Sequence, residues 1–313
     1  MYTNITSLSS LTFILTGVPR LEASHTWISI PFFCLYITAL SRNGMILFVI
    51  ITEPSLHEPM YYFLSMLSTT DLGLCISMLV TMLRIFWFNA REISFNACMA
   101  QMFFIHLFTI MGSSVLLAMA FDHFVAISNP LRYTTILTNA RITQIVVAIV
   151  SIAIVILIPL ILLLRRLSFC HSHVLQYSYC FHPDVMKLSC SDTKMNSAFG
   201  LTATILVAGV DATLILLSYV LIIHSILNIA SPEECKKAFS TCISHMTAVA
   251  IFYIPLTSLS FVHRFKKKAP TYLPTLISNI SLFIPPVMNP IIYSVETKEI
   301  CKALLKNFCP KKF

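Results

Sequence analysis

The sequence predicts an all-α integral membrane protein, a seven-transmembrane helix bundle followed by a short amphipathic C-terminal helix. Charged residues make up only 11% of the 313 residues, against about 25% in an ordinary soluble domain. Apolar residues reach 57%, and the mean hydropathy is +0.82. A soluble fold of this length has no core large enough to bury that much apolar surface, whereas a lipid bilayer accommodates it.

Seven apolar runs are long enough to cross a bilayer, because a membrane-spanning helix needs about 20 mainly apolar residues. Their prolines do not exclude helices, since neighbouring helices satisfy the freed backbone groups within a membrane. We expect one membrane domain over 27–294, an extracellular N-terminus over 1–26 and a cytoplasmic tail over 295–313. The predicted spans are 27–51, 61–83, 99–121, 142–164, 197–224, 238–262 and 271–294.

The orientation has to come from features other than positive charge. With the N-terminus outside, nine Lys and Arg residues would be cytoplasmic and eleven extracellular, so their distribution does not decide. Asn4 begins the glycosylation sequon Asn4-Ile5-Thr6, which is usable only if the N-terminus is extracellular. Four cysteines suited to disulfides lie on the same side of the membrane. We therefore expect a multi-pass plasma-membrane protein whose N-terminus is extracellular.

The C-terminal tail carries an amphipathic pattern. Between Glu296 and Phe313, apolar residues such as Ile300 and Leu304 alternate with lysines such as Lys298 and Lys302. This pattern favours a short helix lying on the cytoplasmic leaflet, although a simply solvated tail is the alternative. The net charge of +8 indicates contact with anionic membrane lipids and not with nucleic acid. Two tail cysteines are candidate palmitoylation sites, Cys301 and Cys309.

Four of the ten cysteines share one side of the membrane. Cys98 opens the third span, and Cys170, Cys180 and Cys190 lie in the long 165–196 loop. Two disulfides fit an oxidising side, but the sequence leaves three pairings open. The alternative is a metal site, because three histidines share the loop. They are His171, His173 and His182. We favour the disulfides and predict no metal.

Five sequence segments resemble the signatures of odorant receptors, a family of G-protein-coupled receptors. They occur in the family's order in spans two, three, five, six and seven, so the resemblance covers essentially the whole chain. The long 165–196 loop and the His263-Arg264-Phe265 segment are similar to the class I, or fish-like, subgroup. The segments are PMYYFLSMLSTTDL from Pro59, MAFDHFVAISNPLRY from Met119, SYVLI from Ser218, KAFSTCISH from Lys237 and PPVMNPIIY from Pro285.

The resemblance implies a rhodopsin-like bundle that binds a small-molecule odorant in a pocket on the extracellular side. It further implies coupling to the heterotrimeric stimulatory G protein of olfaction, which raises cAMP. Neither catalysis nor a cofactor is implied. The family pattern pairs Cys98 with Cys180 and Cys170 with Cys190.

Candidate ligand-binding residues lie in spans three and six. Tyr253, Thr257, Ser260 and Arg264 share one helical face that would run from mid-membrane to the extracellular side. An Arg with a nearby hydroxyl suits a small carboxylate, which the guanidinium can bind through two hydrogen bonds. The alternative is an interfacial Arg beside the basic residues 266–268. His106 matches a family position that borders the pocket, and a purely structural histidine is its alternative. The role of Asp211 stays open between pocket floor and interhelical contact.

The resemblance also assigns the switch residues. Asp122 and His123 occupy the family's Asp-Arg-Tyr-like motif, and the Asn289-Pro290-Ile291-Ile292-Tyr293 segment gives span seven a kink and a rotatable Tyr293. Asp71 matches a buried acid that holds water or sodium together with Asn289.

Four positions depart from the family pattern. His123 replaces the motif's Arg, Gly112 stands where a Glu is frequent, and Arg20 replaces a turn Gly. Arg42 replaces a Gly that lets span one pack closely, and a charge at that depth costs about 2.5–3.5 kcal/mol. These departures suggest the hypothesis of impaired coupling or surface expression.

A membrane transporter or channel is the main alternative function. It predicts paired charges, discontinuous helices or an inverted repeat in the spans, and the sequence shows none of these. A retinal protein would need a Lys in span seven, which 271–294 lacks. A membrane enzyme would need clustered catalytic groups, whereas His106 and His245 fall on different predicted helices.

Overall fold

The computed structural model describes residues 11–17, 25–170, 173–227, 231–265, 272–296, 299–300 and 302. Within these residues, seven helices are long and apolar enough to cross a membrane, which confirms the predicted bundle. All seven predicted runs overlap the observed spans. Asn4, Arg20, Cys301, Cys309 and most of the predicted tail helix lie outside the described residues. The spans are Ser29–Thr52, Pro59–Phe86, Phe95–Ser128, Asn139–Arg165, Lys194–Ile226, Ala238–Leu259 and Thr275–Tyr293.

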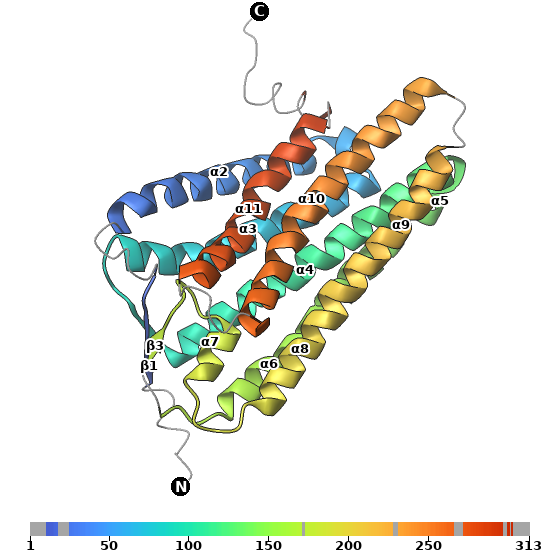
Figure 1. The fold of residues 1–313 in the computed structure, drawn as a ribbon. Helices are drawn as coiled ribbons and strands as arrows, with labels where there is room; N and C mark the ends of the chain where they lie inside the picture. The colour runs from blue at the N-terminus through green and yellow to red at the C-terminus, as the bar shows by residue number, and fades with distance from the viewer. Residues whose placement is uncertain are drawn as a thin grey trace, which may run out of the picture.

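The seven long helices pack side by side (Figure 1). The fifth span is composite, because a π-helical segment, η4, separates α8 from α9. In chain order the long elements are α2 (His25–Thr52), α3 (Pro59–Phe86), α4 (Phe95–Ser128), α6 (Asn139–Arg165), α8 (Lys194–Thr204), η4 (Ile205–Gly209), α9 (Val210–Ile226), α10 (Pro232–Phe265) and α11 (Tyr272–Glu296). The short ones are η2 (Pro54–Leu56), η3 (Pro130–Arg132), α5 (Tyr133–Ile136) and α7 (His182–Lys187).

Local sequence explains where several helices begin. Pro59 is the first residue of α3, a position where its missing N–H is not needed. Ser94 caps α4 by accepting a hydrogen bond from the Ala97 N–H at 3.4 Å. Thr138 caps α6 in the same way, accepting from the Arg141 N–H at 3.4 Å.

A small three-stranded sheet lies at one end of the bundle, and the sequence did not predict it. β1 (Thr12–Leu15) pairs antiparallel with β2 (Glu92–Ser94) and parallel with β3 (Val174–Leu175). Strands this short carry too little alternation to be recognised in the sequence. The same end contains the disulfides Cys98–Cys180 and Cys170–Cys190. The sheet and the first disulfide therefore hold the N-terminal strand and the 165–196 loop against the start of α4.

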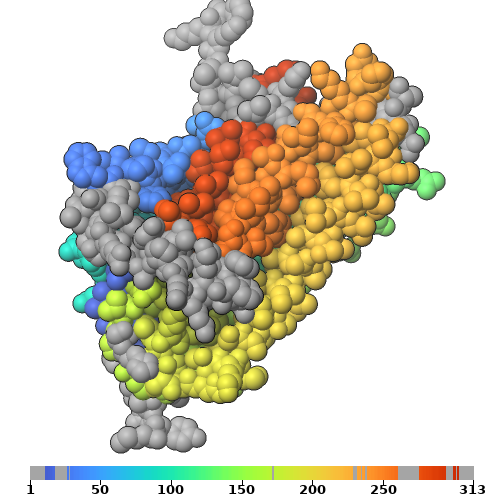
Figure 2. Space-filling view, viewed as in Figure 1, coloured from blue at the N-terminus to red at the C-terminus, as the bar shows by residue number. Residues whose placement is uncertain are grey.

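The outer face of the bundle is apolar. Val155 on α6 is 69% exposed and Val220 on α9 is 64% exposed, which suits lipid and not water. Figure 2 shows α10 lying between α11 and the fifth span on one broad face of the molecule.

Arg42 does not block helix packing, contrary to the expectation from the sequence. Its side chain lies on the exposed face of α2, whereas the next residue, Asn43, is buried. The Asn43 amide donates to the Ala39 carbonyl at 2.9 Å and to the Pro286 carbonyl at 2.8 Å. The contact of α2 with α11 is therefore intact, and Arg42 instead places a charge toward lipid.

Gly73 permits the close contact between α3 and α4. A Cβ atom at Gly73 would lie 2.4 Å from the ring of Phe108, so an alanine would displace that ring. At Gly44 on α2, by contrast, a Cβ atom would meet nothing within 4 Å.

We predict that Gly73→Ala destabilises the protein by about 1–3 kcal/mol because it overpacks this contact. Gly44→Ala is the matched control and should leave stability unchanged or slightly higher, since alanine favours helix. Thermal unfolding of the purified protein in lipid nanodiscs measures both. Equal melting temperatures for the two variants would contradict the proposed contact.

Candidate functional site

A cavity of about 400 Å³ lies toward the sheet end of the bundle, bounded by α4, α6, α7, the α8–η4 segment and α10. Most of its wall is apolar, from leucines such as Leu157, Leu160, Leu256 and Leu259. Its polar lining residues are few: His106, Thr109, Ser113, His182, Ser197 and Thr204. An apolar space with a few polar groups is typical of a site for a small organic molecule.

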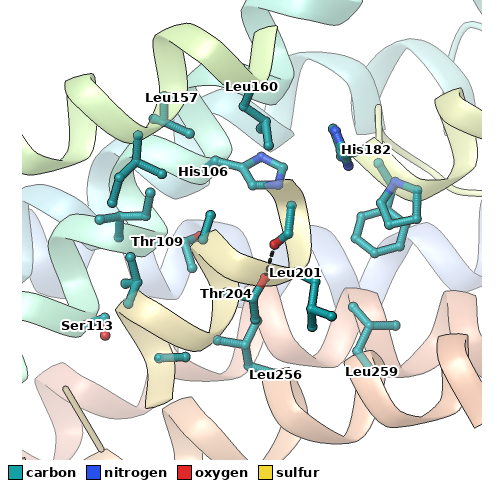
Figure 3. Close-up of a pocket in the computed structure, with 18 of the residues that line it drawn as sticks. His106, Thr109, Ser113, Leu157, Leu160, His182, Leu201, Thr204, Leu256 and Leu259 are labelled. Carbon is teal, nitrogen blue, oxygen red and sulfur yellow. Dashed lines mark hydrogen bonds between the residues drawn. The ribbon is translucent and has the colours of Figure 1, made fainter. Parts of the chain in front are cut away.

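His106 presents one defined nitrogen to this cavity. Its Nδ1 lies 2.7 Å from the Met102 carbonyl, which can only accept, so Nδ1 carries the proton of the neutral ring. Nε2 is then the nitrogen left to accept a hydrogen bond. Figure 3 shows the His106 and His182 rings on one side of the cavity, across from Leu256 and Leu259.

His182 is the second histidine of the cavity, at the start of the loop helix α7. It is buried, and its Nε2 has no hydrogen-bond partner. Burial, followed by the electrostatic interaction with the neighbouring His106, lowers the pKa of His182 to about 3. The His182 ring is therefore neutral at pH 7. It can donate or accept hydrogen bonds but carries no positive charge.

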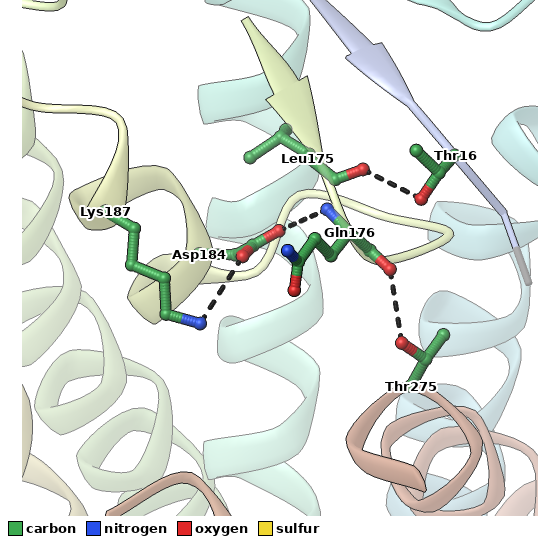
Figure 4. Close-up of polar contacts among 6 residues, drawn as sticks. All are labelled: Thr16, Leu175, Gln176, Asp184, Lys187 and Thr275. Atoms are coloured by element: carbon green, nitrogen blue, oxygen red, sulfur yellow. Dashed lines mark hydrogen bonds and ion pairs between the residues drawn. The ribbon is translucent and has the colours of Figure 1, made fainter. Parts of the chain in front are cut away.

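The loop that carries His182 is tied to two other parts of the protein and is braced internally (Figure 4). The Thr16 hydroxyl donates to the Leu175 carbonyl at 3.0 Å, and the Thr275 hydroxyl of α11 donates to the Gln176 carbonyl at 3.1 Å. Asp184 of α7 accepts from the Gln176 N–H at 2.6 Å and lies 3.6 Å from the Lys187 ammonium. These contacts hold α7 in place over the cavity.

A polar network forms the floor of the cavity and joins three helices. The Ser113 hydroxyl of α4 donates to Asp211 of α9 at 2.7 Å and lies 2.7 Å from the Tyr253 hydroxyl of α10. Ser114 also donates to the same Asp211 oxygen, at 3.4 Å. Asp211, whose role the sequence left open, is thus an interhelical acceptor beneath the cavity.

The predicted ligand residues of α10 fall in different places. Tyr253 is buried, and its hydroxyl forms a hydrogen bond with Ser113, which lines the cavity. Thr257 does not line the cavity: it is exposed, and its hydroxyl donates to the Tyr253 carbonyl at 2.7 Å. Leu256 and Leu259 occupy the inward face instead. The α10 backbone continues through Ser260 and Arg264 to Phe265, but their side chains lie outside the described residues.

Several lining residues were missed in the sequence. His182 was noted only as a candidate metal ligand, and Thr109, Ser197 and Thr204 were not singled out. No local pattern marks them, because each becomes a cavity residue only when α8 packs near α4 and α10.

A second cavity of about 80 Å³ lies deeper in the bundle, between the first cavity and Asp71. It shares His106 and Leu256 with the first cavity and is also lined by Gly112. Asp71 accepts a hydrogen bond from the Asn289 amide at 3.0 Å. A Cβ atom at Gly112 would lie 3.4 Å from the Phe252 ring, so the missing side chain helps to leave this space open.

The cytoplasmic half contains the predicted switch residues. Asp122 is buried and accepts a hydrogen bond from the Tyr133 hydroxyl at 2.8 Å. His123 is buried beside His245 of α10, with ring centres 5.1 Å apart. Pro290 lies inside α11, and Tyr293 of the same helix is buried.

Comparison with solved structures shows a known fold. The fold resembles squid rhodopsin with a TM-score of 0.70 over 93% of this chain and 87% of that chain, at 17% sequence identity. The shared architecture is a bundle of seven long apolar helices.

Comparison of sequences identifies the family. The sequence model of the olfactory receptor family matches residues 32–311. Human olfactory receptor OR51C1 is 67% identical over 98% of both chains, and human olfactory receptor 51F1 is 59% identical over 94% of this chain and 92% of its own. The chain belongs to the olfactory receptor family. It is accordingly an odorant receptor of the plasma membrane and not an enzyme.

Proposed function

We propose that this receptor binds small carboxylic acids, or odorants of similar polarity, in the 400 Å³ cavity and signals through a stimulatory G protein that raises cAMP. The observation that carries the proposal is the cavity itself, with its apolar wall and two histidines. The leucines would hold an alkyl chain, and the polar groups would orient its oxygen-bearing end.

The acid would need a cationic partner in addition to the histidines. His182 is neutral at pH 7, because its pKa is about 3, so it can donate or accept a hydrogen bond but cannot neutralise a carboxylate. Arg264 supplies that charge in the proposal. It lies five residues beyond the cavity residue Leu259 on the same helix, and Ser260 lies between them. Arg binds a carboxylate through two parallel hydrogen bonds.

The floor network offers a route from ligand to helix movement. A ligand that contacts Ser113 would compete with its hydrogen bonds to Asp211 and Tyr253. Ligand binding would then change the relative stability of alternative positions of α10. Such a difference is what shifts the population from one conformation to another. In the proposal, Asn289, Pro290 and Tyr293 take part in the cytoplasmic rearrangement, and Asp71 with Asn289 holds water or sodium.

Coupling is weakened in this proposal by two departures from the family pattern. His123 lacks the long cationic side chain of the family's Arg, and Gly112 lacks the carboxyl of its Glu. Among the described residues, Asp122 pairs with the Tyr133 hydroxyl and not with a cation.

Filling the cavity tests the binding site. We predict that Thr204→Phe abolishes the cAMP response to odorants, because the ring would occupy the cavity. Thr213→Phe is a matched control on the fifth span. Both residues are exposed and both hydroxyls donate to a carbonyl four residues earlier, but only Thr204 lines the cavity. Equal loss with both variants, at equal surface expression, would contradict this site.

Removing the cation tests the ligand class. We predict that Arg264→Ala reduces the cAMP response to C2–C10 carboxylic acids by at least about tenfold in half-maximal concentration, since an ion pair is lost. Responses to alcohols of the same length should change less. Arg165→Ala, on the same side of the membrane, is the control. Unchanged acid responses in Arg264→Ala would remove Arg264 from the site.

Restoring the family residues tests coupling. We predict that the double variant His123→Arg with Gly112→Glu raises the maximal cAMP response by at least about fivefold. Phe124→Tyr, which completes the family motif without adding charge, is the control. Surface labelling corrects for expression. An unaltered chain that signals as strongly as the double variant would show that coupling is not impaired.

A further inference from the structure

The second cavity, of about 80 Å³, is separated from the first by side chains that line both. Two of these come from successive turns of α4, two from successive turns of α10 and one from the 165–196 loop. They are His106, Thr109, Leu256, Leu259 and Phe181, and the first four are labelled in Figure 3. Because each of them faces both cavities, the wall between the cavities is about one side chain thick.

Gly112 continues the same face of α4 toward the cytoplasmic side, since it lies three residues after Thr109. A Cβ atom at this position would lie 3.4 Å from the Phe252 ring and 3.7 Å from the Thr70 hydroxyl. Phe252 and Thr70 both line the second cavity. A side chain at position 112 would therefore extend into this cavity and fill part of it.

The second cavity suits an apolar group better than water, although polar side chains contribute to its lining. Its three aliphatic hydroxyls each donate to a carbonyl of the same helix and so are already paired. The pairs are Thr70 with Leu67 at 2.7 Å, Thr109 with Ile105 at 2.8 Å, and Ser281 with Ser278 at 2.8 Å. Asp71 accepts a hydrogen bond from the Asn289 amide at 3.0 Å. A buried water needs two to four polar partners, whereas the rest of this wall is apolar. It includes Leu74, Phe108, Phe252 and Leu282.

The second cavity also lies farther along α10 from Arg264, the residue proposed to bind the polar end of an acid. Phe252 precedes Arg264 by twelve residues, which is about 18 Å along the helix axis. Leu259 and Leu256 line the space between these two positions. A short acid held at Arg264 would occupy the first cavity alone, whereas a longer chain would extend past Leu256 toward Phe252.

We propose that the second cavity is a deep arm of the odorant site, that it takes the distal alkyl end of long straight-chain odorants, and that Gly112 sets the longest chain that fits. The inference rests on the proposed binding of small polar odorants in the first cavity. A volume of 80 Å³ holds about two or three methylene groups, if each takes a volume close to the 30 Å³ of a water molecule. Rotation of the Leu256 side chain to another rotamer would join the two cavities.

Ligand stabilisation across a homologous series tests the deep arm. Butanoic to decanoic acids and the corresponding alcohols are added to the purified receptor in lipid nanodiscs. The rise in melting temperature gives each dissociation constant without requiring G-protein coupling. In the unaltered protein, affinity should increase about fourfold for each of the last two or three methylene groups. Gly112→Val should remove these increments, so decanoic acid should bind about 15–60-fold more weakly while butanoic acid changes less than about twofold.

Two further variants keep the test decisive if Gly112→Val folds poorly. Gly112→Ala adds only a Cβ atom, which fits at 3.4 Å from Phe252, and should cost about one fourfold increment. Ser281→Val fills the same space from α11 and should reproduce the loss seen with Gly112→Val. Gly44→Val is the control, because an added Cβ atom there meets nothing within 4 Å, and it should retain the full dependence on chain length. Gly112→Glu would also fill the arm, so it should weaken long-chain ligands whatever it does to the maximal response.

The outcomes separate this inference from the proposed ligand class. Equal weakening of short and long chains by Gly112→Val, or no weakening of long chains, would overturn the deep arm even if Arg264→Ala impairs acid binding. A chain-length effect of Gly112→Val with alcohols alone would support the arm and refute the preference for acids. No stabilisation of the unaltered receptor by any member of the series would refute both.

Discussion

Lipid neither donates nor accepts hydrogen bonds, so each polar group in a span must find a partner inside the bundle. The polar pairs determine which helices lie next to each other. Asn43 joins α2 to the Pro286 carbonyl of α11, Asn289 joins α11 to Asp71 of α3, and Ser113 joins α4 to Asp211. Apolar packing alone gives little preference for one neighbour over another when the tails outside are equally apolar. Polar pairs therefore select the helix register on which the cavity depends.

The two halves of the receptor have different chemistry. At the sheet end, disulfides and loop hydrogen bonds fix α7, so His182 faces a preformed cavity that requires little ordering when a ligand binds. In the cytoplasmic half, the buried rings of His123 and His245 lie 5.1 Å apart, and the Tyr219 hydroxyl lies 2.7 Å from Nδ1 of His245. The contacts of the first half are disulfides and hydrogen bonds of a loop, whereas those of the second are ring contacts and hydrogen bonds between helices.

The sequence was sufficient for the seven spans, because a run of about 20 apolar residues is a strong signal. It was weaker for the site. Helical spacing placed Thr257 on the same face as Tyr253, but the structure turns Leu256 and Leu259 inward and leaves Thr257 exposed. Spacing predicts which residues share a face and not which face meets the cavity. The sequence could not predict that His182 lines the cavity, because its position depends on hydrogen bonds between its loop and distant parts of the chain.

The π-helical segment Ile205–Gly209 has a consequence for how this helix tolerates changes in length. A π turn accommodates one more residue than an α turn while the flanking helix continues in nearly the same orientation. Loss of one residue there could be absorbed by return to regular α geometry, leaving Thr204 and Asp211 facing inward. The same loss within α9 would rotate all that follows by about 100°. Deletion of one residue in this span should therefore be tolerated within 205–209 and not within α9.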